Sequence, residues 1–320
     1  MRRKLTLFAF VAVVASLTAG VATAANGGFT PVTPHSPNAA HTNTAYYVIL
    51  GFTAAIFVIV EGALVTFIVK YRGRGRPRTQ DGAQVHGHTR LELIWTVIPV
   101  LILCVIGIVV FLELPSITSA PAASNPLRVT VEGHQFYWQF DYPNGTRTIN
   151  GLVVPVGRVV DLKVVSEDVI HSWWIPALGG KIQAIPGVTN HIWFRADKAG
   201  TYTGQCAELC GLYHASMTAR VTATNDAGYR AALAAAPANL GRAEFTGTCA
   251  TCHGMTGQGG YGPNLSNNPL LTQRAGLLAI LQHGFLKMPA VGNDWTPTQL
   301  NALADYVKAH IFKGAAPVGG

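Results

Sequence analysis

Two long apolar runs dominate the first third of the sequence. Residues 45–69 and 93–112 each hold enough apolar side chains to cross a bilayer as a helix, which takes about 20 residues. Together they predict a transmembrane hairpin over residues 45–114. The connecting loop, residues 70–90, carries Lys70, Arg72, Arg74, Arg76, Arg78 and Arg90 against Asp81 alone. The positive-inside rule places this loop in the cytoplasm and both flanking regions outside.

A shorter apolar run lies at the N-terminus. Arg2, Arg3 and Lys4 precede an apolar stretch over residues 5–14, and Ala22-Thr23-Ala24 supplies small residues for a cleavage site. This pattern predicts a signal peptide over residues 1–24. A retained first span is the alternative, and the short apolar core disfavours it. Residues 25–44, rich in Pro, Thr and Asn, would form an exported N-terminal segment, which agrees with the loop charges.

The hydrophobic period changes after the hairpin. From Leu127 the chain holds short segments rich in Val, Ile, Thr and aromatic residues, separated by Gly, Pro and Asn: LRVTVEG, QFYWQFDYP, RVVDLKVVS, HIWFRA and MTARVTA. Such strands without intervening helical runs predict a Greek-key all-β sandwich or barrel over residues 127–223. An Ala-rich stretch, residues 224–239, then reads as a linker or short helix before a third unit, residues 240–320. Apolar positions within residues 298–312 recur at a spacing of three to four, which predicts a terminal helix.

The charge distribution excludes a nucleic-acid role. The chain has a net charge of +8. Three Lys or Arg residues lie in residues 1–4, six in the predicted cytoplasmic loop and fourteen beyond Leu127, where eleven acidic residues reduce the net charge to +3. The basic excess therefore reflects membrane topology, and no basic face is implied. With 49% hydrophobic and 12% charged residues, the composition fits a membrane protein with exported domains.

Four of the five cysteines lie in two tight pairs beside histidine and methionine. In QCAELCGLYHASM, residues 205–217, two thiols, an imidazole and a thioether come from Cys206, Cys210, His214 and Met217. These soft donors with one nitrogen suit copper. A one-copper blue site needs a single cysteine, so either the pair bridges two metal ions or one thiol is spare. His171, which follows a predicted strand, is the natural second nitrogen ligand because one loop cannot enclose a site.

The second cysteine pair belongs to CATCHG, residues 249–254. In CxxCH, Cys249 and Cys252 attach a haem through thioethers and His253 binds its iron from one face. Met288 is the candidate for the opposite face, with His283 as the alternative. Thioether ligation raises the reduction potential of a haem and favours electron transfer over ligand activation.

Acidic residues in the hairpin are candidates for function. Glu61 lies inside the first predicted span and Glu92 at the cytoplasmic mouth of the second, and a carboxylate within a membrane is costly. Neither span contains a histidine. Any haem or metal chemistry within the membrane therefore belongs to another chain.

The order of these motifs resembles subunit II of haem-copper cytochrome c oxidases, in the branch with a fused C-terminal cytochrome c domain. The resemblance covers essentially all of the mature chain, and its most specific segments are LELIWTVIP, GHQFYWQF, SEDVIHSWWIPALGGK, AIPG and QCAELCGLYHASM. It implies a multidomain membrane protein with a two-helix hairpin, a Greek-key cupredoxin-like domain with a binuclear copper centre, CuA, and an all-α class I cytochrome c domain.

The resemblance also assigns roles to single residues. Cys206 and Cys210 would bridge both coppers, with one histidine, His171 or His214, on each. Met217 and the backbone carbonyl of Glu208 would complete the copper shell, and the carboxylate of Glu208 would bind magnesium shared with subunit I. Glu92 matches a glutamate at the entrance of a proton pathway.

Two positions depart from the pattern of the family. Phe136 stands where the family usually has the tryptophan through which soluble cytochrome c delivers electrons, which favours a haem supplied by the same chain. Gln183 replaces an aspartate before the AIPG turn near the subunit interface. Quinol oxidases of the same superfamily lack the copper ligands, all of which are present here.

The resemblance implies an electron-transfer subunit of a proton-translocating cytochrome c oxidase in the bacterial inner membrane. Electrons would pass from an external donor, a cytochrome c or a quinol-cytochrome c reductase, through haem c and CuA to subunit I, with subunit III as a further partner. One alternative is the CuA subunit of a related nitric oxide reductase. Another is a membrane-anchored copper-delivery protein, which a closed ligand set beside a covalent haem disfavours.

Overall fold

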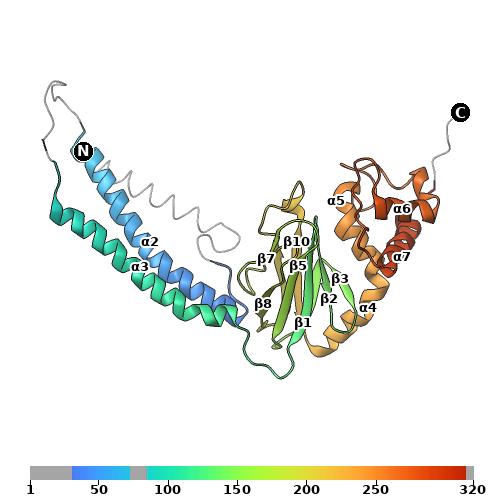
Figure 1. Cartoon of the computed structure of the whole chain (residues 1–320), viewed down its shortest axis with the longest axis horizontal. Helices are drawn as coiled ribbons and strands as arrows, with labels where there is room; N and C mark the ends of the chain where they lie inside the picture. Colours follow the sequence, from blue (N-terminus) through green and yellow to red (C-terminus); the bar gives the residue numbers. More distant parts are fainter. Residues whose placement is uncertain (1–30, 73–83, 85, 315–320) are drawn as a thin grey trace, which may run out of the picture. The chain divides into compact units, whose positions relative to one another are not determined.

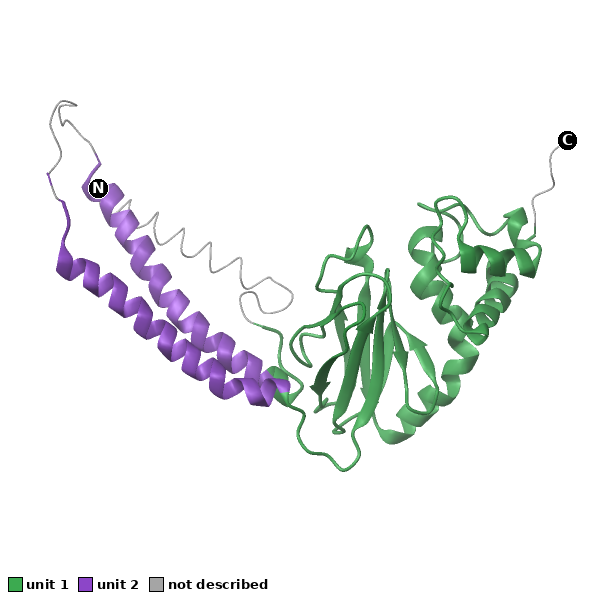
Figure 2. Ribbon diagram, viewed as in Figure 1, with its two compact units in different colours: residues 1–39, 119–320 green, residues 40–118 purple. Residues whose placement is uncertain are grey.

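The computed structural model describes residues 31–72, 84 and 86–314. The predicted signal peptide and much of the predicted cytoplasmic loop lie outside these residues, so both stay predictions. The chain divides into two compact units (Figure 2). One unit consists of residues 40–118, and the other combines residues 1–39 with residues 119–320.

Two long apolar helices, α2 (Pro37–Lys70) and α3 (Thr89–Thr118), form the hairpin (Figure 1). Their most apolar stretches have mean hydropathies of 2.4 and 3.0, so both are long and apolar enough to cross a membrane. Helix α2 begins ahead of the apolar run because proline fits the first turn of a helix. At the end away from the loop, His41 Nδ1 lies 2.6 Å from Glu113 Oε2. This contact ties the start of α2 to the last turns of α3.

The two acidic residues of the hairpin have different surroundings. Glu61 lies on an exposed face of α2. Glu92 lies in the first turn of α3, where its Oε1 accepts a hydrogen bond of 3.0 Å from the backbone N–H of His88. A carboxylate at a helix N-terminus satisfies a free backbone donor and complements the helix dipole. The structure therefore gives Glu92 a local capping role, and its place in a proton pathway stays a prediction.

Ten strands build the β domain (Figure 1). They form a five-stranded sheet in the order β3-β2-β1-β5-β8, a three-stranded sheet in the order β4-β10-β9, and a two-stranded ribbon of β6 and β7. The strands are β1 (Leu127–His134), β2 (Tyr137–Asp141), β3 (Arg147–Ile149), β4 (Gly151–Pro155), β5 (Val160–Ser166), β6 (His171–Trp173), β7 (Ile182–Ala184), β8 (Asn190–Phe194), β9 (Gly200–Gln205) and β10 (Thr218–Thr224).

Alternating side chains fill the space between the sheets. In β1 and β5 every second residue is buried, and the two strands pair in parallel with Val131 opposite Val164. Strand β10 pairs in parallel with β4 and antiparallel with β9. Trp138, Phe140 and Leu152 are fully buried in this core. The predicted all-β sandwich is therefore confirmed, with crossovers that join distant strands in each sheet.

The C-terminal domain is helical. It contains α4 (Asp226–Glu244), the π-helical turn η2 (Phe245–Cys249), α5 (Ala250–His253), η3 (Pro269–Leu271), α6 (Arg274–His283), α7 (Pro297–Tyr306) and η4 (Val307–Ile311). The stretch expected as a linker or short helix, residues 224–239, lies mostly within the 19-residue helix α4. Asn225 explains this start, since its side chain accepts a hydrogen bond of 2.8 Å from Gly228 N. The predicted terminal helix corresponds to α7 and η4, and Thr296 with Gln299 forms a capping box at its start.

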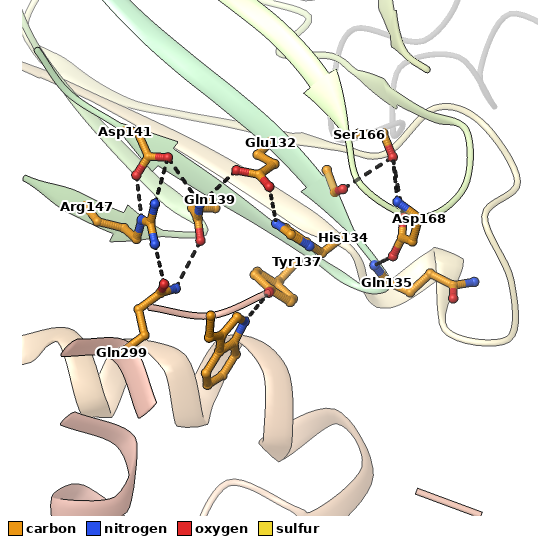
Figure 3. Close-up of polar contacts among 12 residues, drawn as sticks. Glu132, His134, Gln135, Tyr137, Gln139, Asp141, Arg147, Ser166, Asp168 and Gln299 are labelled. Atoms are coloured by element: carbon orange, nitrogen blue, oxygen red, sulfur yellow. Dashed lines mark hydrogen bonds and ion pairs between the residues drawn. The ribbon is translucent and has the colours of Figure 1, made fainter. Parts of the chain in front are cut away.

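Buried polar contacts join the β domain to the helical domain (Figure 3). The side chain of Gln299 in α7 donates to Glu244 Oε1 at 2.8 Å and to Gln139 Oε1 in β2 at 3.1 Å. Arg147 in β3 donates to Gln299 Oε1 and, at 2.5 Å, to Asp141 Oδ1. We call these five residues the Gln299 clamp. A further buried bond of 2.9 Å runs from Trp295 Nε1 to the hydroxyl of Tyr137.

Glu244 is a buried ionisable residue of the Gln299 clamp with incomplete hydrogen bonding. Its side chain is fully buried, and no hydrogen-bond partner is present for Oε2 among the described residues. Burial raises the pKa of Glu244 to about 7, although the bond from Gln299 and the charge of Arg147 oppose the shift. A carboxyl with a raised pKa keeps its proton in the folded state after the unfolded chain has released it. Its contribution to stability is full below the unfolded pKa, 4.5, and is lost as the pH rises through 7.

The raised pKa of Glu244 leads to a pH-dependent prediction. Glu244→Gln keeps the contact with Gln299 and removes the ionisable group. We expect the variant to gain stability relative to wild type, by up to about 3 kcal/mol, as the pH rises from about 5 to about 8. Denaturant unfolding at several pH values measures the difference. A difference that stays flat across this pH range would contradict the assignment.

Candidate copper centre and haem pocket

The pairing of strands β9 and β10 brings together the two ends of the loop that carries the predicted copper ligands. Strands β9 and β10 run antiparallel with Gln205 opposite Thr218, so residues 206–217 leave and rejoin the sheet at neighbouring points. The backbone N–H of Cys206 donates to Met217 O at 2.9 Å. The short helix η1 (His214–Ser216) turns the chain back toward β10. The first and last ligands of the loop therefore lie side by side at its base.

The structure brings all six predicted copper donors together. Cys206 Sγ lies 3.9 Å from Cys210 Sγ, and Cys210 Sγ lies 3.7 Å from Met217 Sδ. His171 Nδ1 is 3.9 Å from Cys206 Sγ, and His214 Nδ1 is 3.5 Å from Cys210 Sγ. The sixth donor, the backbone oxygen of Glu208, is 3.2 Å from Cys206 Sγ. Each cysteine sulfur thus has one imidazole beside it, a donor set that fits two soft metal ions sharing two thiolates.

His171 is held by contacts from the β domain. It is fully buried at the start of β6, and its Nε2 lies 2.8 Å from Asp168 Oδ1, which leaves Nδ1 for the thiol side. A Cβ on Gly133 in β1 would lie 2.8 Å from the imidazole, so only glycine leaves room for the ring there. The ring of Trp138 packs edge-on at 5.9 Å between centroids. Orientation of a metal-binding histidine by a carboxylate is common in metalloproteins.

The two thiols differ in their electrostatics. For Cys206, burial acts to raise the pKa, but hydrogen bonding with His171 and the neighbouring backbone outweighs it and the pKa is lowered. For Cys210, burial and the negative charge of Cys206 raise the pKa. The metal-free loop therefore favours a single thiolate at Cys206, and a bound cation would be needed to deprotonate both thiols.

The haem motif opens onto a large cavity. The cavity measures about 810 Å³ and has mainly apolar walls, among them Phe245, Leu281 and Leu303. Cys249, Cys252 and His253 line it from η2 and α5, and Met288 lines it from the loop after α6. His283, the alternative iron ligand, is exposed and is absent from the cavity lining. The cavity therefore favours Met288 over His283.

The polar groups at the cavity fit a covalently held haem. His253 Nδ1 lies 2.9 Å from the carbonyl oxygen of Pro263, which fixes the tautomer with Nε2 free to bind iron. A Cβ on Gly262 would lie 2.7 Å from the His253 ring, so the loop packs directly on the imidazole. Cys249 and Cys252 form no disulfide bond, so both sulfurs are available to attach a haem. An apolar cavity with two thiols and one oriented imidazole suits a haem attached by thioethers.

Comparison with protein families and relatives decides the class of this chain. Residues 25–113 match the model of the transmembrane domain of cytochrome c oxidase subunit II, and residues 146–224 match that of its periplasmic domain. Cytochrome c oxidase subunit 2 of Alkalihalophilus pseudofirmus is 37% identical over 237 residues, which cover 67% of each chain. The chain belongs to the cytochrome c oxidase subunit II family. A probable subunit 2 from Rickettsia bellii is 34% identical, over 59% of this chain and 76% of the relative.

The remaining comparisons concern the two exported domains. Residues 236–307 of this subunit II chain match the model of subunit III of cbb3-type cytochrome c oxidase. The crystal structure of the periplasmic domain of subunit II from Bradyrhizobium japonicum is 34% identical and covers 38% of this chain and 98% of that one, with a TM-score of 0.35. The predicted fold class is confirmed: two apolar helices, a cupredoxin-like β-sandwich and a helical cytochrome c domain. As a subunit II, the chain is part of a haem-copper oxidase that contains a subunit I.

Several residues at these sites were not predicted from the sequence. Asp168 orients His171, and its position three residues earlier in SEDVIH was the one signal that could have identified it. Gln135 donates to the carbonyl oxygen of Cys210 at 2.6 Å and anchors the copper loop next to the end of β1. Tyr213 contacts both the β domain and the haem domain. Contacts between distant segments of this kind have no local sequence pattern.

Asp168 provides a test of the copper site. Asp168→Asn weakens the carboxylate contact that orients His171, so we expect copper affinity to fall by about 10–100-fold. Competition with a copper chelator, followed by optical spectroscopy, measures the loss. Glu167→Gln, at the exposed neighbouring position, is the matched control and should retain wild-type affinity. Equal copper retention in both variants would contradict the role of Asp168.

Proposed function

We propose that this chain is the electron-entry subunit of a terminal cytochrome c oxidase. When bound, haem c and the binuclear CuA centre would carry electrons from an external donor, a cytochrome c or a quinol-cytochrome c reductase, to the oxygen-reducing site of subunit I. The observation that carries this proposal is the closed set of six donors on His171 and the loop 206–217, beside a haem-sized cavity in the same compact unit. Permanent redox centres need such closed sites, whereas copper delivery needs an exchangeable one.

The copper-binding residues would hold their metal ions in a fixed geometry. Cys206, Cys210, His171 and His214 would hold the two coppers. Met217 is fully buried, and Met217 Sδ and Glu208 O lie beside opposite thiols. The Asp168 contact, the Gly133 packing and the closed base of the loop leave these donors little freedom to move. Rigid ligands reduce the rearrangement that accompanies a change of metal charge.

The haem-binding residues would set the reduction potential of the haem. Cys249 and Cys252 would attach the haem through thioethers, and His253 and Met288 would supply ligands for its iron. Methionine ligation raises a haem potential, as does an apolar cavity that disfavours added charge. The chain supplies both features through Met288 and the Leu- and Phe-rich walls.

The copper loop also offers a surface for subunit I. Leu209 and Leu212 are 78% and 74% exposed on this loop, and the Glu208 side chain beside them is exposed as well. Exposed apolar side chains around one carboxylate suit a partner that buries them and shares a cation with Glu208. We propose magnesium as this cation and subunit I as the partner, with subunit III elsewhere in the complex.

The proposed membrane topology places the copper and haem domains outside the cytoplasm. The chain would be exported by its N-terminal signal peptide and anchored by α2 and α3 in the bacterial inner membrane. The copper and haem domains would then lie on the extracytoplasmic side, and Glu92 would lie at the cytoplasmic end of α3. This position suits the entrance of a proton pathway shared with subunit I.

Substitution of the bridging thiols tests the copper assignment. We expect Cys206→Ser and Cys210→Ser each to abolish the purple copper spectrum, because one thiolate cannot bridge and neutralise two coppers. The haem spectrum should remain, since the haem residues lie in another domain. Optical and electron paramagnetic resonance spectra of the purified complex measure both. Loss of both signals from either variant would count against separate sites.

Substitution of Met288 tests the haem assignment. Met288→Leu keeps the approximate volume of the side chain and removes the sulfur, so the methionine-to-iron band in the near infrared should disappear and the haem potential should fall. Near-infrared absorption and a redox titration measure the two effects. His283→Leu is the matched control and should leave the band in place. An unchanged band in Met288→Leu would eliminate this ligand.

A further inference from the structure

Tyr213 lies between the copper loop and the haem cavity. Its ring packs edge-on against Phe136 of the β domain, with centroids 5.5 Å apart. The same ring packs edge-on against Tyr261 of the haem domain, with centroids 6.0 Å apart. Tyr261 lines the haem cavity, and Tyr213 immediately precedes the copper-ligand candidate His214. Three aromatic rings therefore form a continuous contact between the two candidate cofactor sites.

A second group of contacts places Tyr213 against the haem-attachment motif. The side chains of Tyr213 and Cys252 are close neighbours. Cys252 also lines the haem cavity. On the other side, a Cβ on Gly211 would lie 3.2 Å from the Phe136 ring, so the copper loop is in direct contact with Phe136. Tyr213 thus touches residues on both sides of the domain junction.

The Gln299 clamp holds this junction in place. Its buried bonds come from two strands of the β domain and two helices of the haem domain. The Tyr137–Trp295 hydrogen bond adds a second fixed point. Buried polar contacts of this kind are directional, and a shifted domain would leave them unpaired. The position of Tyr261 against Tyr213 is therefore fixed by contacts outside the aromatic group.

We propose that Tyr213 is the electronic contact through which electrons cross from the haem domain to the copper loop. This inference rests on the proposed function. In each transfer one electron would leave the haem, which would be oxidised, and enter the copper pair, which would be reduced. No bond forms or breaks at Tyr213, and its phenol keeps its proton. Tyr213 acts by filling the gap between the two sites with one continuous aromatic contact.

This role explains the side chain at the position of Phe136. A surface tryptophan that receives electrons from a soluble donor must be accessible. Here Phe136 is in contact with Tyr213, and Tyr213 with the haem domain of the same chain. The donor side of the copper loop is therefore an internal interface, and an external donor would meet the haem domain instead.

A competing route runs beside the Gln299 clamp. Trp295 of the haem domain is hydrogen-bonded to Tyr137, and Trp138, the next residue in β2, packs its ring on His171. The order Trp295, Tyr137, Trp138 and His171 thus also connects the two domains. Each route includes one step along the backbone, from Tyr137 to Trp138 or from Tyr213 to His214. Tyr261 lines the haem cavity, whereas Trp295 is not among the lining residues, so the contact through Tyr213 begins closer to the haem site. A test must separate the two routes.

The experiment uses the purified complex with both cofactors. A photoreductant reduces the haem in a flash, and absorbance then follows oxidation of the haem and reduction of the copper centre. We expect Tyr213→Leu to slow this transfer by about tenfold or more, since small losses of contact and orientation have large effects on rate. Tyr213→Phe keeps the ring and should stay within about threefold of wild type. Ser216→Ala, on the same loop, is the matched control and should leave the rate unchanged.

A second measurement separates electronic contact from simple docking. Pulsed electron paramagnetic resonance gives the distance between the oxidised haem and the copper centre, and redox titration gives their potentials. Slower transfer in Tyr213→Leu with unchanged distance and potentials supports the proposal. An unchanged rate overturns it, and so does a longer distance, which would make Tyr213 a docking residue. Slower transfer in Trp295→Phe but not in Tyr213→Leu would assign the route to Trp295. Absence of the copper or haem signal from wild type would refute the proposed function itself.

Discussion

The hydrogen-bonded register between β9 and β10 is the constraint on which the copper site depends. It places Gln205 opposite Thr218 and brings Cys206 N–H onto the carbonyl oxygen of Met217, so the copper loop begins and ends at one point. A shift of one residue would turn each side chain of β10 to the other face of its sheet. Met217, now fully buried beside Cys210, would then point away from the thiols. The buried core of the sandwich therefore protects the geometry of the site.

His171 shows how the rest of the β domain completes this loop. It comes from β6, 35 residues before Cys206 in the chain, and three separate elements fix it: Asp168 through a hydrogen bond, Gly133 through the space it leaves, and Trp138 through ring packing. Each contact restricts a different motion of the imidazole. A metal site with such support changes little when its charge changes, which is the physical requirement for rapid electron transfer.

The junction between the two exported domains combines apolar packing with buried polar contacts. Tyr137 and Ile149 of the β domain pack in one apolar cluster with residues of the helical domain. Beside this cluster, polar side chains join the domains: Gln299, Gln139, Arg147 and Asp141 (Figure 3), together with Glu244. The polar contacts specify one orientation because displaced partners lose their hydrogen bonds. Glu244 makes the unfavourable contribution to stability, because one of its oxygens has no hydrogen-bond partner among the described residues and its pKa is raised to about 7. Orientation at this junction is therefore obtained at some expense in stability at neutral pH.

The sequence by itself determined the apolar helices, the β-rich middle domain and the two ligand motifs, because membrane helices, strand alternation and metal or haem ligands each leave a local pattern. It also predicted His171 as a distant ligand. The tertiary structure decided what local patterns do not carry: that residues 224–239 belong mostly to the long helix α4, that Met288 and not His283 lines the haem cavity, and that Asp168 supports His171. It alone brought Tyr213 against Tyr261 and Gln299 against Glu244. These contacts join segments far apart in the chain, and their energy depends on the packing of whole domains rather than on any neighbouring residue.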